Sequence, residues 1–112
     1  MSDEDILKLV KLVHTAIWAL MATAIVAVPI AAMLGRFRVA GWLSVLIIAE
    51  CLVLLLNGGR CPLTDLAARF TSDRSVNFDI FLQPWLAEHN KLIFGSLFVA
   101  GELVLVRLWF AR

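Results

Sequence analysis

The sequence predicts an all-α integral membrane protein with three transmembrane helices. The chain has 112 residues, of which 62% are hydrophobic, and its mean hydropathy is +0.90. Soluble globular domains are only about 45–50% apolar. Three apolar runs lie at Leu12–Leu34, Val39–Leu56 and Leu92–Phe110. Each is close to the ~20 residues that a helix needs to cross a hydrocarbon core, and the length allows a single transmembrane domain, residues 1–112.

The helices are expected at about residues 6–34, 39–57 and 84–110. The first run continues back to Ile6 as an amphipathic helix, and Pro29 within it is tolerated as a kink in a membrane helix. The sequence Gly35-Arg36-Phe37-Arg38 leaves room only for a tight turn. The first two helices should therefore form an antiparallel hairpin. Pro84 is expected to open the third helix.

The link at residues 58–90 contains two short stretches with helical spacing. The first comprises Leu63, Leu66, Ala67 and Phe70, and the second Phe78, Phe81, Leu82 and Trp85. Each set follows the i, i+3, i+4, i+7 pattern of one helix face. Both stretches are too short to span a membrane, so we expect two interfacial helical segments. Gly58-Gly59 should end the preceding helix, and Pro62 suits a first helical position.

Basic residues in the flanks set the expected orientation. Six Lys and Arg residues lie on the side of the N-terminus and the link, and four lie on the opposite side. Because cytoplasmic loops carry the excess of basic residues, we expect a cytoplasmic N-terminus. The net charge of +1 leaves no basic face for phosphates, which argues against nucleic acid as a partner.

Two carboxylates, Glu50 and Glu102, lie inside the apolar runs. Such groups cost about 2.5–3.5 kcal/mol each at mid-helix, so they are candidates for function. At ~1.5 Å per residue they lie about 16 and 12 Å from the same membrane face. If the second and third helices pack together, the pair would share a proton. Alternatively, each is a protonated or hydrogen-bonded packing residue. In both cases we expect the two carboxylates to point into the bundle or a protein interface.

A second polar group lies toward the N-terminal side of the membrane. His14 begins the first run, Cys61 follows the second, and His89 precedes the third. His14, Cys61 and His89 have the side chains of a metal site, and His14, Glu50 and His89 those of a haem- or quinone-binding site. No pair has a metal-motif spacing such as CxxC or HExxH. Histidines that only form hydrogen bonds at helix ends therefore remain the alternative.

His14, Glu50, Cys61-Pro62-Leu63-Thr64 and His89 together resemble a bacterial family of small integral membrane proteins classed as a domain of unknown function. The resemblance covers roughly residues 12–90. It implies that Cys-Pro-Leu-Thr closes a membrane helix and that an interfacial segment and a His-containing stretch follow. The chain departs from the family's pattern at Asp65-Leu66, where members carry a glutamate, and at His89-Asn90-Lys91, where they have His-Tyr-Leu. The resemblance implies a bacterial inner membrane and no particular activity.

Three classes of function stay open. The first is a non-catalytic accessory or scaffold subunit that packs against a larger membrane complex, lipid, pigment or a second copy. A stripe of small residues on the first helix favours close packing of this kind; it comprises Thr15, Ala19, Thr23, Ala27 and Ala31. The second class binds a metal, haem or quinone. The third is an oligomeric proton-coupled carrier that uses Glu50 and Glu102. No sequence motif pairs a nucleophile with a base, so no catalytic residue is expected.

Overall fold

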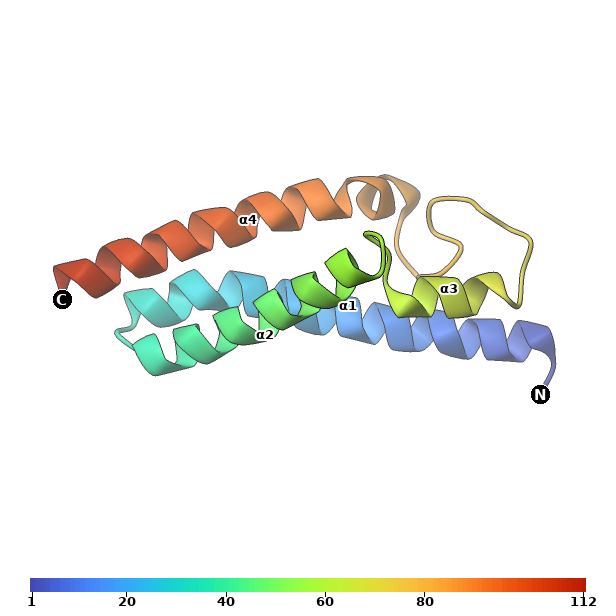
Figure 1. Cartoon of the computed structure of the whole chain (residues 1–112), viewed down its shortest axis with the longest axis horizontal. Coiled ribbons are helices and arrows are strands. Elements are labelled where there is room, and N and C mark those ends of the chain that lie inside the picture. The colour runs from blue at the N-terminus through green and yellow to red at the C-terminus, as the bar shows by residue number, and fades with distance from the viewer.

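The computed structural model describes all 112 residues as an elongated helical bundle of 55 × 25 × 24 Å. Its helices are α1 (Asp3–Met33), α2 (Phe37–Leu56), α3 (Pro62–Ala68) and α4 (Pro84–Ala111). The termini lie at opposite ends of the long axis (Figure 1). Three of the helices, α1, α2 and α4, are long and apolar enough to cross a membrane. The predicted all-α fold with three candidate spans is confirmed.

Helix α1 is the longest element, and its start is capped by its own side chains. The Ser2 hydroxyl accepts a hydrogen bond from the Asp5 amide, and the Asp5 carboxylate accepts one from the Ser2 amide. This reciprocal capping satisfies two amide groups that a helix start leaves free. With 31 residues, α1 is about 46 Å long. It exceeds a hydrocarbon core of ~30 Å, so it extends beyond the membrane at one end or both.

Glycines close the two helix ends where the chain reverses. Gly35 has φ +75°, and the following Arg36 amide donates to the Ala31 carbonyl at 2.9 Å. Gly59 has φ +82°, and its amide donates to the Leu54 carbonyl at 2.7 Å. Both ends use left-handed glycines to satisfy carbonyls that would otherwise lack a donor. The tight α1–α2 hairpin and the end of α2 at Gly58-Gly59 are confirmed.

The bundle is built around α1. Helices α2 and α4 both pack along it, whereas they contact each other only sparsely. The core consists of Ala24, Ile25 and Val28 on α1 and Ile47 on α2. Phe94 and Phe98 of α4 pack against this core and stay partly exposed. Because α2 and α4 both pack on α1 but contact each other sparsely, the core is centred on α1.

The link agrees with its prediction in the first half only. Pro62 does open a short helix, α3, which lies beside the N-terminal half of α1 (Figure 1). The prediction of a second helical segment around Phe78 to Trp85 is wrong. Residues 69–83 form turns, bends and irregular backbone, and the next helix begins at Pro84. The amide of Phe81 donates to the Thr15 hydroxyl at 2.9 Å. The backbone there is satisfied by α1 and not by a helix of its own.

Gly101 marks a close contact between α4 and α1. It is buried, and a Cβ placed on it would lie 3.1 Å from Cδ of Pro29. Helix α1 continues without a break through Pro29. The proline ring therefore occupies space that only a glycine on α4 leaves open.

We predict that Gly101→Val lowers the stability of the bundle by about 1–3 kcal/mol, the usual cost of overpacking. The matched control is Gly41→Val on α2, because a Cβ at Gly41 meets nothing within 4 Å. Thermal unfolding of both variants in the same detergent measures the difference. Equal midpoints for the two variants would contradict the close α1–α4 contact.

Candidate functional site

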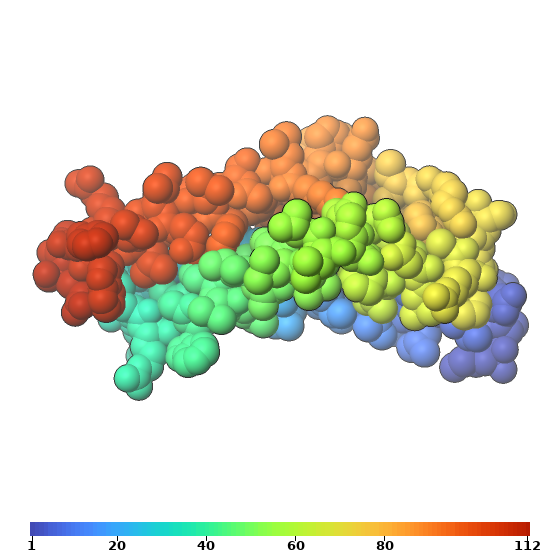
Figure 2. Space-filling model, viewed as in Figure 1, coloured from blue at the N-terminus to red at the C-terminus, as the bar shows by residue number.

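A cavity of about 610 Å³ lies where α2 and α4 separate over α1. Its walls come from the C-terminal half of α2, the N-terminal half of α4 and the middle of α1, and the link closes one end. Figure 2 shows α3 and the loop after it (yellow) between the start of α4 and the N-terminal part of α1 (blue). Ligand pockets in proteins usually have volumes of about 300–1,000 Å³. This cavity is therefore large enough for a small molecule.

The cavity has an apolar part and a polar end. Met21, Ile25, Ile47, Phe94 and Phe98 contribute to the apolar walls. At the end closed by the link, the lining includes His14, Arg60, Cys61, Thr64, Asp79, Asn90 and Lys91. Apolar walls with a few polar groups at one end are typical of sites that bind and orient a ligand.

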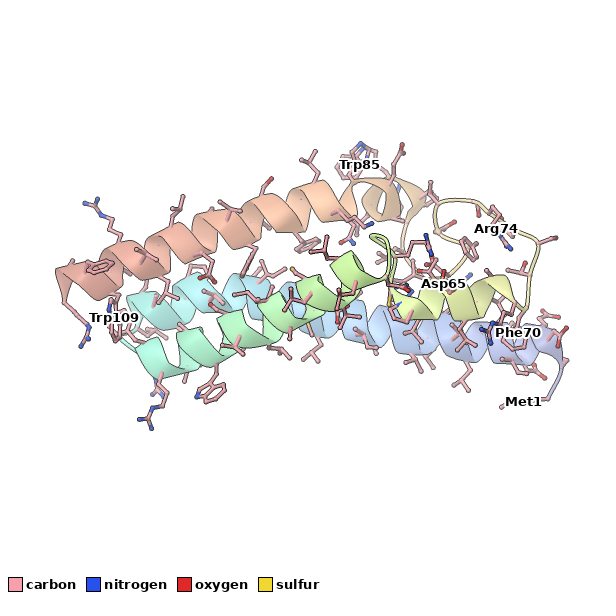
Figure 3. The ribbon with its side chains drawn as sticks, in the orientation of Figure 1. Met1, Asp65, Phe70, Arg74, Trp85 and Trp109 are labelled. Carbon is pink, nitrogen blue, oxygen red and sulfur yellow. The ribbon has the colours of Figure 1, made fainter.

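The corner between α2 and α3 is held by a small polar cluster. The Asn57 amide group donates to the Arg60 carbonyl at 2.8 Å and to the Asp65 carboxylate at 2.9 Å. The Arg60 guanidinium donates to the same carboxylate at 3.0 Å. Figure 3 shows Asp65 at this corner. These bonds, from Asn57 first and Arg60 second, lower the pKa of Asp65, and they fix the turn that carries Cys61.

A buried carboxylate, Asp79, ties the link to α1 and α3. Its side chain accepts a hydrogen bond from the Thr64 hydroxyl. Its backbone carbonyl accepts one from Nδ1 of His14 at 3.0 Å, and its carboxylate lies 3.7 Å from the same nitrogen. Asp79 is only 8% exposed. No sequence pattern singles out Asp79, because a lone aspartate in a loop carries no spacing signal.

Further hydrogen bonds connect the closed end of the cavity to α4. The Trp18 indole donates to the Asn90 side chain at 2.6 Å, and the Lys91 ammonium donates to the Gly59 carbonyl. Trp18 also packs edge-on against Phe94, with ring centroids 5.6 Å apart. All three long helices therefore contribute to this end.

His14 and Cys61, predicted as site residues, come together. The Cys61 thiol lies beside the His14 imidazole, and both residues line the cavity. They are separated by 46 intervening residues in the chain, so no local motif announces the pair. The fold alone brings this thiol and this imidazole together.

Glu50 and Glu102 occupy different surroundings. Glu50 lines the cavity, whereas Glu102 accepts a hydrogen bond from the buried Ser44 hydroxyl at 2.5 Å. No hydrogen bond joins the two carboxylates, and Glu102 does not line the cavity. The structure thus gives a hydrogen-bond partner to Glu102 and a place in the cavity lining to Glu50.

His89 does not join His14. Its ring stacks on Trp85 with centroids 4.6 Å apart, and its Nδ1 donates to the Trp85 carbonyl at 2.8 Å. Figure 3 shows Trp85 pointing away from the other helices. The expected metal site of His14, Cys61 and His89 is not assembled, and no other group of three metal-binding side chains is. His89 also does not line the cavity that His14 and Glu50 line.

The geometry defines a small helical protein with three candidate membrane spans and a cavity that is apolar inside and polar at one end. Comparison of the chain with protein-family models, with curated proteins and with solved structures finds no match. Only the geometry of the site therefore bears on the function of this chain.

We predict that Asp79→Ala destabilises the protein by about 1–3 kcal/mol, since it leaves the Thr64 hydroxyl without its acceptor in a part-buried site. The control is Asp73→Ala in the same loop, because residue 73 is exposed. Thermal unfolding and limited proteolysis of residues 69–83 measure the effect. Equal resistance of the two variants to proteolysis would show that Asp79 does not anchor the link.

Asn57→Ala should raise the pKa of Asp65 toward its ordinary value, because it removes the strongest cause of the lowering. A carboxyl whose pKa is lowered on folding stabilises the fold above its unfolded value of about 3.9. That contribution disappears as the pH falls through the folded value. NMR titration of the Asp65 carboxyl carbon in detergent tests this. Asn77→Ala is the control, since Asn77 donates to the Leu82 carbonyl instead, and an unchanged titration in Asn57→Ala would refute the assignment.

Proposed function

We propose that this protein is an accessory membrane protein that holds one amphiphilic molecule with an acyl or isoprenoid chain. The observation that carries the proposal is the cavity of about 610 Å³ between α2 and α4, with apolar walls and a polar end. An amphiphile has the same division: an apolar chain that fits between the helices and a polar head that fits at the closed end.

The dimensions of the cavity support a chain-like ligand. On α1 the lining extends from His14 to Ile25, which is about 16 Å along the helix. The apolar part of this length lies in the run predicted to cross the membrane. A ligand chain there would contact Met21, Ile47 and Phe94, and each buried CH₂ contributes about 0.8 kcal/mol relative to water.

The polar end supports a head group that accepts hydrogen bonds. Lys91 and Arg60 contribute cationic groups to the lining, and Asn90 contributes an amide. The Lys91 ammonium uses one of its three donors on the Gly59 carbonyl, so donors remain for a ligand. Phosphate, carboxylate and quinone oxygens are all acceptors of this type.

The exposed surface of α1 supports an accessory role. Ala19 and Thr23, in the centre of the small-residue stripe, face away from the bundle, whereas Ala31 is buried within it. The central part of the stripe therefore contacts lipid, a larger membrane complex or a second copy. The resemblance to a bacterial family supports a bacterial inner membrane, and the excess of Lys and Arg near the N-terminus and the link supports an N-terminus in the cytoplasm.

Gly95→Phe should lower retention of the amphiphile about tenfold. Gly95 lines the cavity, and a Cβ there meets nothing within 4 Å, so a phenyl ring extends into the cavity without a backbone clash. The protein is purified in mild detergent, and retained lipid is measured by native mass spectrometry and by mass spectrometry of solvent extracts.

Gly41→Phe is the matched control. Gly41 lies on the groove at the other end of the bundle, also with open space around it. The unmodified chain and Gly41→Phe should retain one amphiphile per protein, and Gly95→Phe about tenfold less. Equal retention in all three, or none in the unmodified chain, would exclude the proposed function.

A further inference from the structure

We propose that Cys61 is a nucleophilic thiol that accepts an acyl group from a long-chain acyl thioester, with His14 as its base and the cavity as the site of the acyl chain. This inference rests on the proposed function, because it uses the same cavity. It adds a covalent step and a substrate class. The observation behind it is the juxtaposition of Cys61, His14 and Asp79 at the closed end of the cavity.

The hydrogen bond from His14 to Asp79 fixes the proton on the imidazole. The partner of Nδ1 is a backbone carbonyl, at 3.0 Å, and a carbonyl oxygen only accepts hydrogen bonds. Nδ1 therefore carries the proton in the neutral ring, and Nε2 keeps its lone pair. The neutral tautomer that this bond selects can take a proton from a neighbouring thiol.

The Asp79 carboxylate supports the charged form of the ring. It lies 3.7 Å from Nδ1 of His14, so it favours the imidazolium that forms when the ring takes a proton. The Thr64 hydroxyl donates to this carboxylate and holds it in place. A thiol, an imidazole and an orienting third group are the parts by which nucleophilic cysteines are activated.

Cys61 and Thr64 belong to the same turn, and this turn links the thiol to the hydrogen bonds of Asp79. The Thr64 amide donates to the Cys61 carbonyl at 2.9 Å, and the Thr64 side chain reaches Asp79. The side chains of His14, Asp79 and Thr64 thus form a connected path that begins and ends beside Cys61. Cys51 also lines the cavity, but it lies within the apolar part of α2, whereas His14 is at the other end with Cys61. The two cysteines therefore provide a comparison within one molecule.

The reaction is a thioester exchange and needs no other reactant. Nε2 of His14 takes the Cys61 proton, and the thiolate attacks the carbonyl carbon of the acyl thioester. A C–S bond forms at Cys61, the C–S bond of the donor breaks, and the donor thiolate leaves with the proton from the imidazole. The acyl chain then lies along the apolar walls, and the water-soluble part of the donor remains outside the polar end.

The test uses the full chain in detergent and alkyne-tagged hexadecanoyl-coenzyme A as the donor. We expect one acyl group on Cys61, removable by neutral hydroxylamine, and little on Cys51. Mass spectrometry of the two cysteine peptides gives both rates from the unmodified protein, so this comparison needs no variant. Equal rates at the two cysteines, or no acyl group at Cys61, would overturn the proposal.

A variant of His14 tests the role of the base separately from the role of the cavity. His14→Ala should slow acylation of Cys61 about a hundredfold, and added imidazole should restore much of the rate, which a purely structural role of His14 would not allow. If the rate is unchanged, or stays low with imidazole in a variant whose thermal unfolding is normal, His14 is not the base.

Iodoacetamide distinguishes a failure of this inference from a failure of the proposed function. The reagent is small, so its reaction with Cys61 reports the activated thiol and should be the same in Gly95→Phe, whereas acylation by the long-chain donor should fall. If Gly95→Phe loses bound amphiphile but Cys61 is neither acylated nor faster than Cys51 with iodoacetamide, only the covalent step is wrong. If Cys61 is acylated equally in Gly95→Phe and Gly41→Phe, the cavity does not hold the transferred chain and this inference fails, whereas the proposed function fails only if amphiphile retention is also equal in the two variants.

Discussion

The structure depends on one constraint: α1 is shared by two helices that scarcely contact each other. The face with Ala24, Ile25 and Val28 packs against α2 and α4 at once. Small side chains at Ala31, Ala40 and Ser44 allow close approach near the hairpin, and Gly101 allows it on α4. Because α2 and α4 contact α1 far more than they contact each other, space between them stays open. The cavity occupies the part of that space beside the link, and a groove lies between the same two helices at the other end.

The second requirement is the satisfaction of polar backbone in the link. A non-helical segment near a membrane needs partners for its amides and carbonyls. Here α1 supplies them: His14 donates to the Asp79 carbonyl, and Thr15 accepts from the Phe81 amide. The same contacts hold the link against α1 and bring Cys61 beside His14. One set of hydrogen bonds therefore provides both the fold of the link and the chemistry of the polar end.

The sequence predicted what depends on local pattern. Apolar runs of spanning length predicted the three long helices. Gly35 and Gly58-Gly59 correctly marked the ends of α1 and α2, and Pro62 and Pro84 correctly marked the starts of α3 and α4. Predictions from the sequence were wrong where a residue distant in the chain determines the local structure. Apolar spacing at Phe78–Trp85 suggested a helix, but the side chain of Thr15 takes the place of a helical carbonyl as partner of the Phe81 amide. Likewise, His89 and His14 both lie near the end of an apolar run, so the sequence does not distinguish them. In the structure, the His89 ring stacks on Trp85 of its own helix.

The unequal lengths of the helices also determine how the protein meets a bilayer. Helix α2 has 20 residues, about 30 Å, which matches the hydrocarbon thickness of an average bilayer. Helix α1 has 31 residues, so ~16 Å more, and α3 packs along that N-terminal half. The shortest span therefore sets the hydrophobic match, and the excess of α1 forms a ledge at the surface. In a thicker bilayer the mismatch would fall on α2, whose end carries the turn to Cys61. Bilayer thickness would then act on the polar end of the cavity before it affects any other part of the protein.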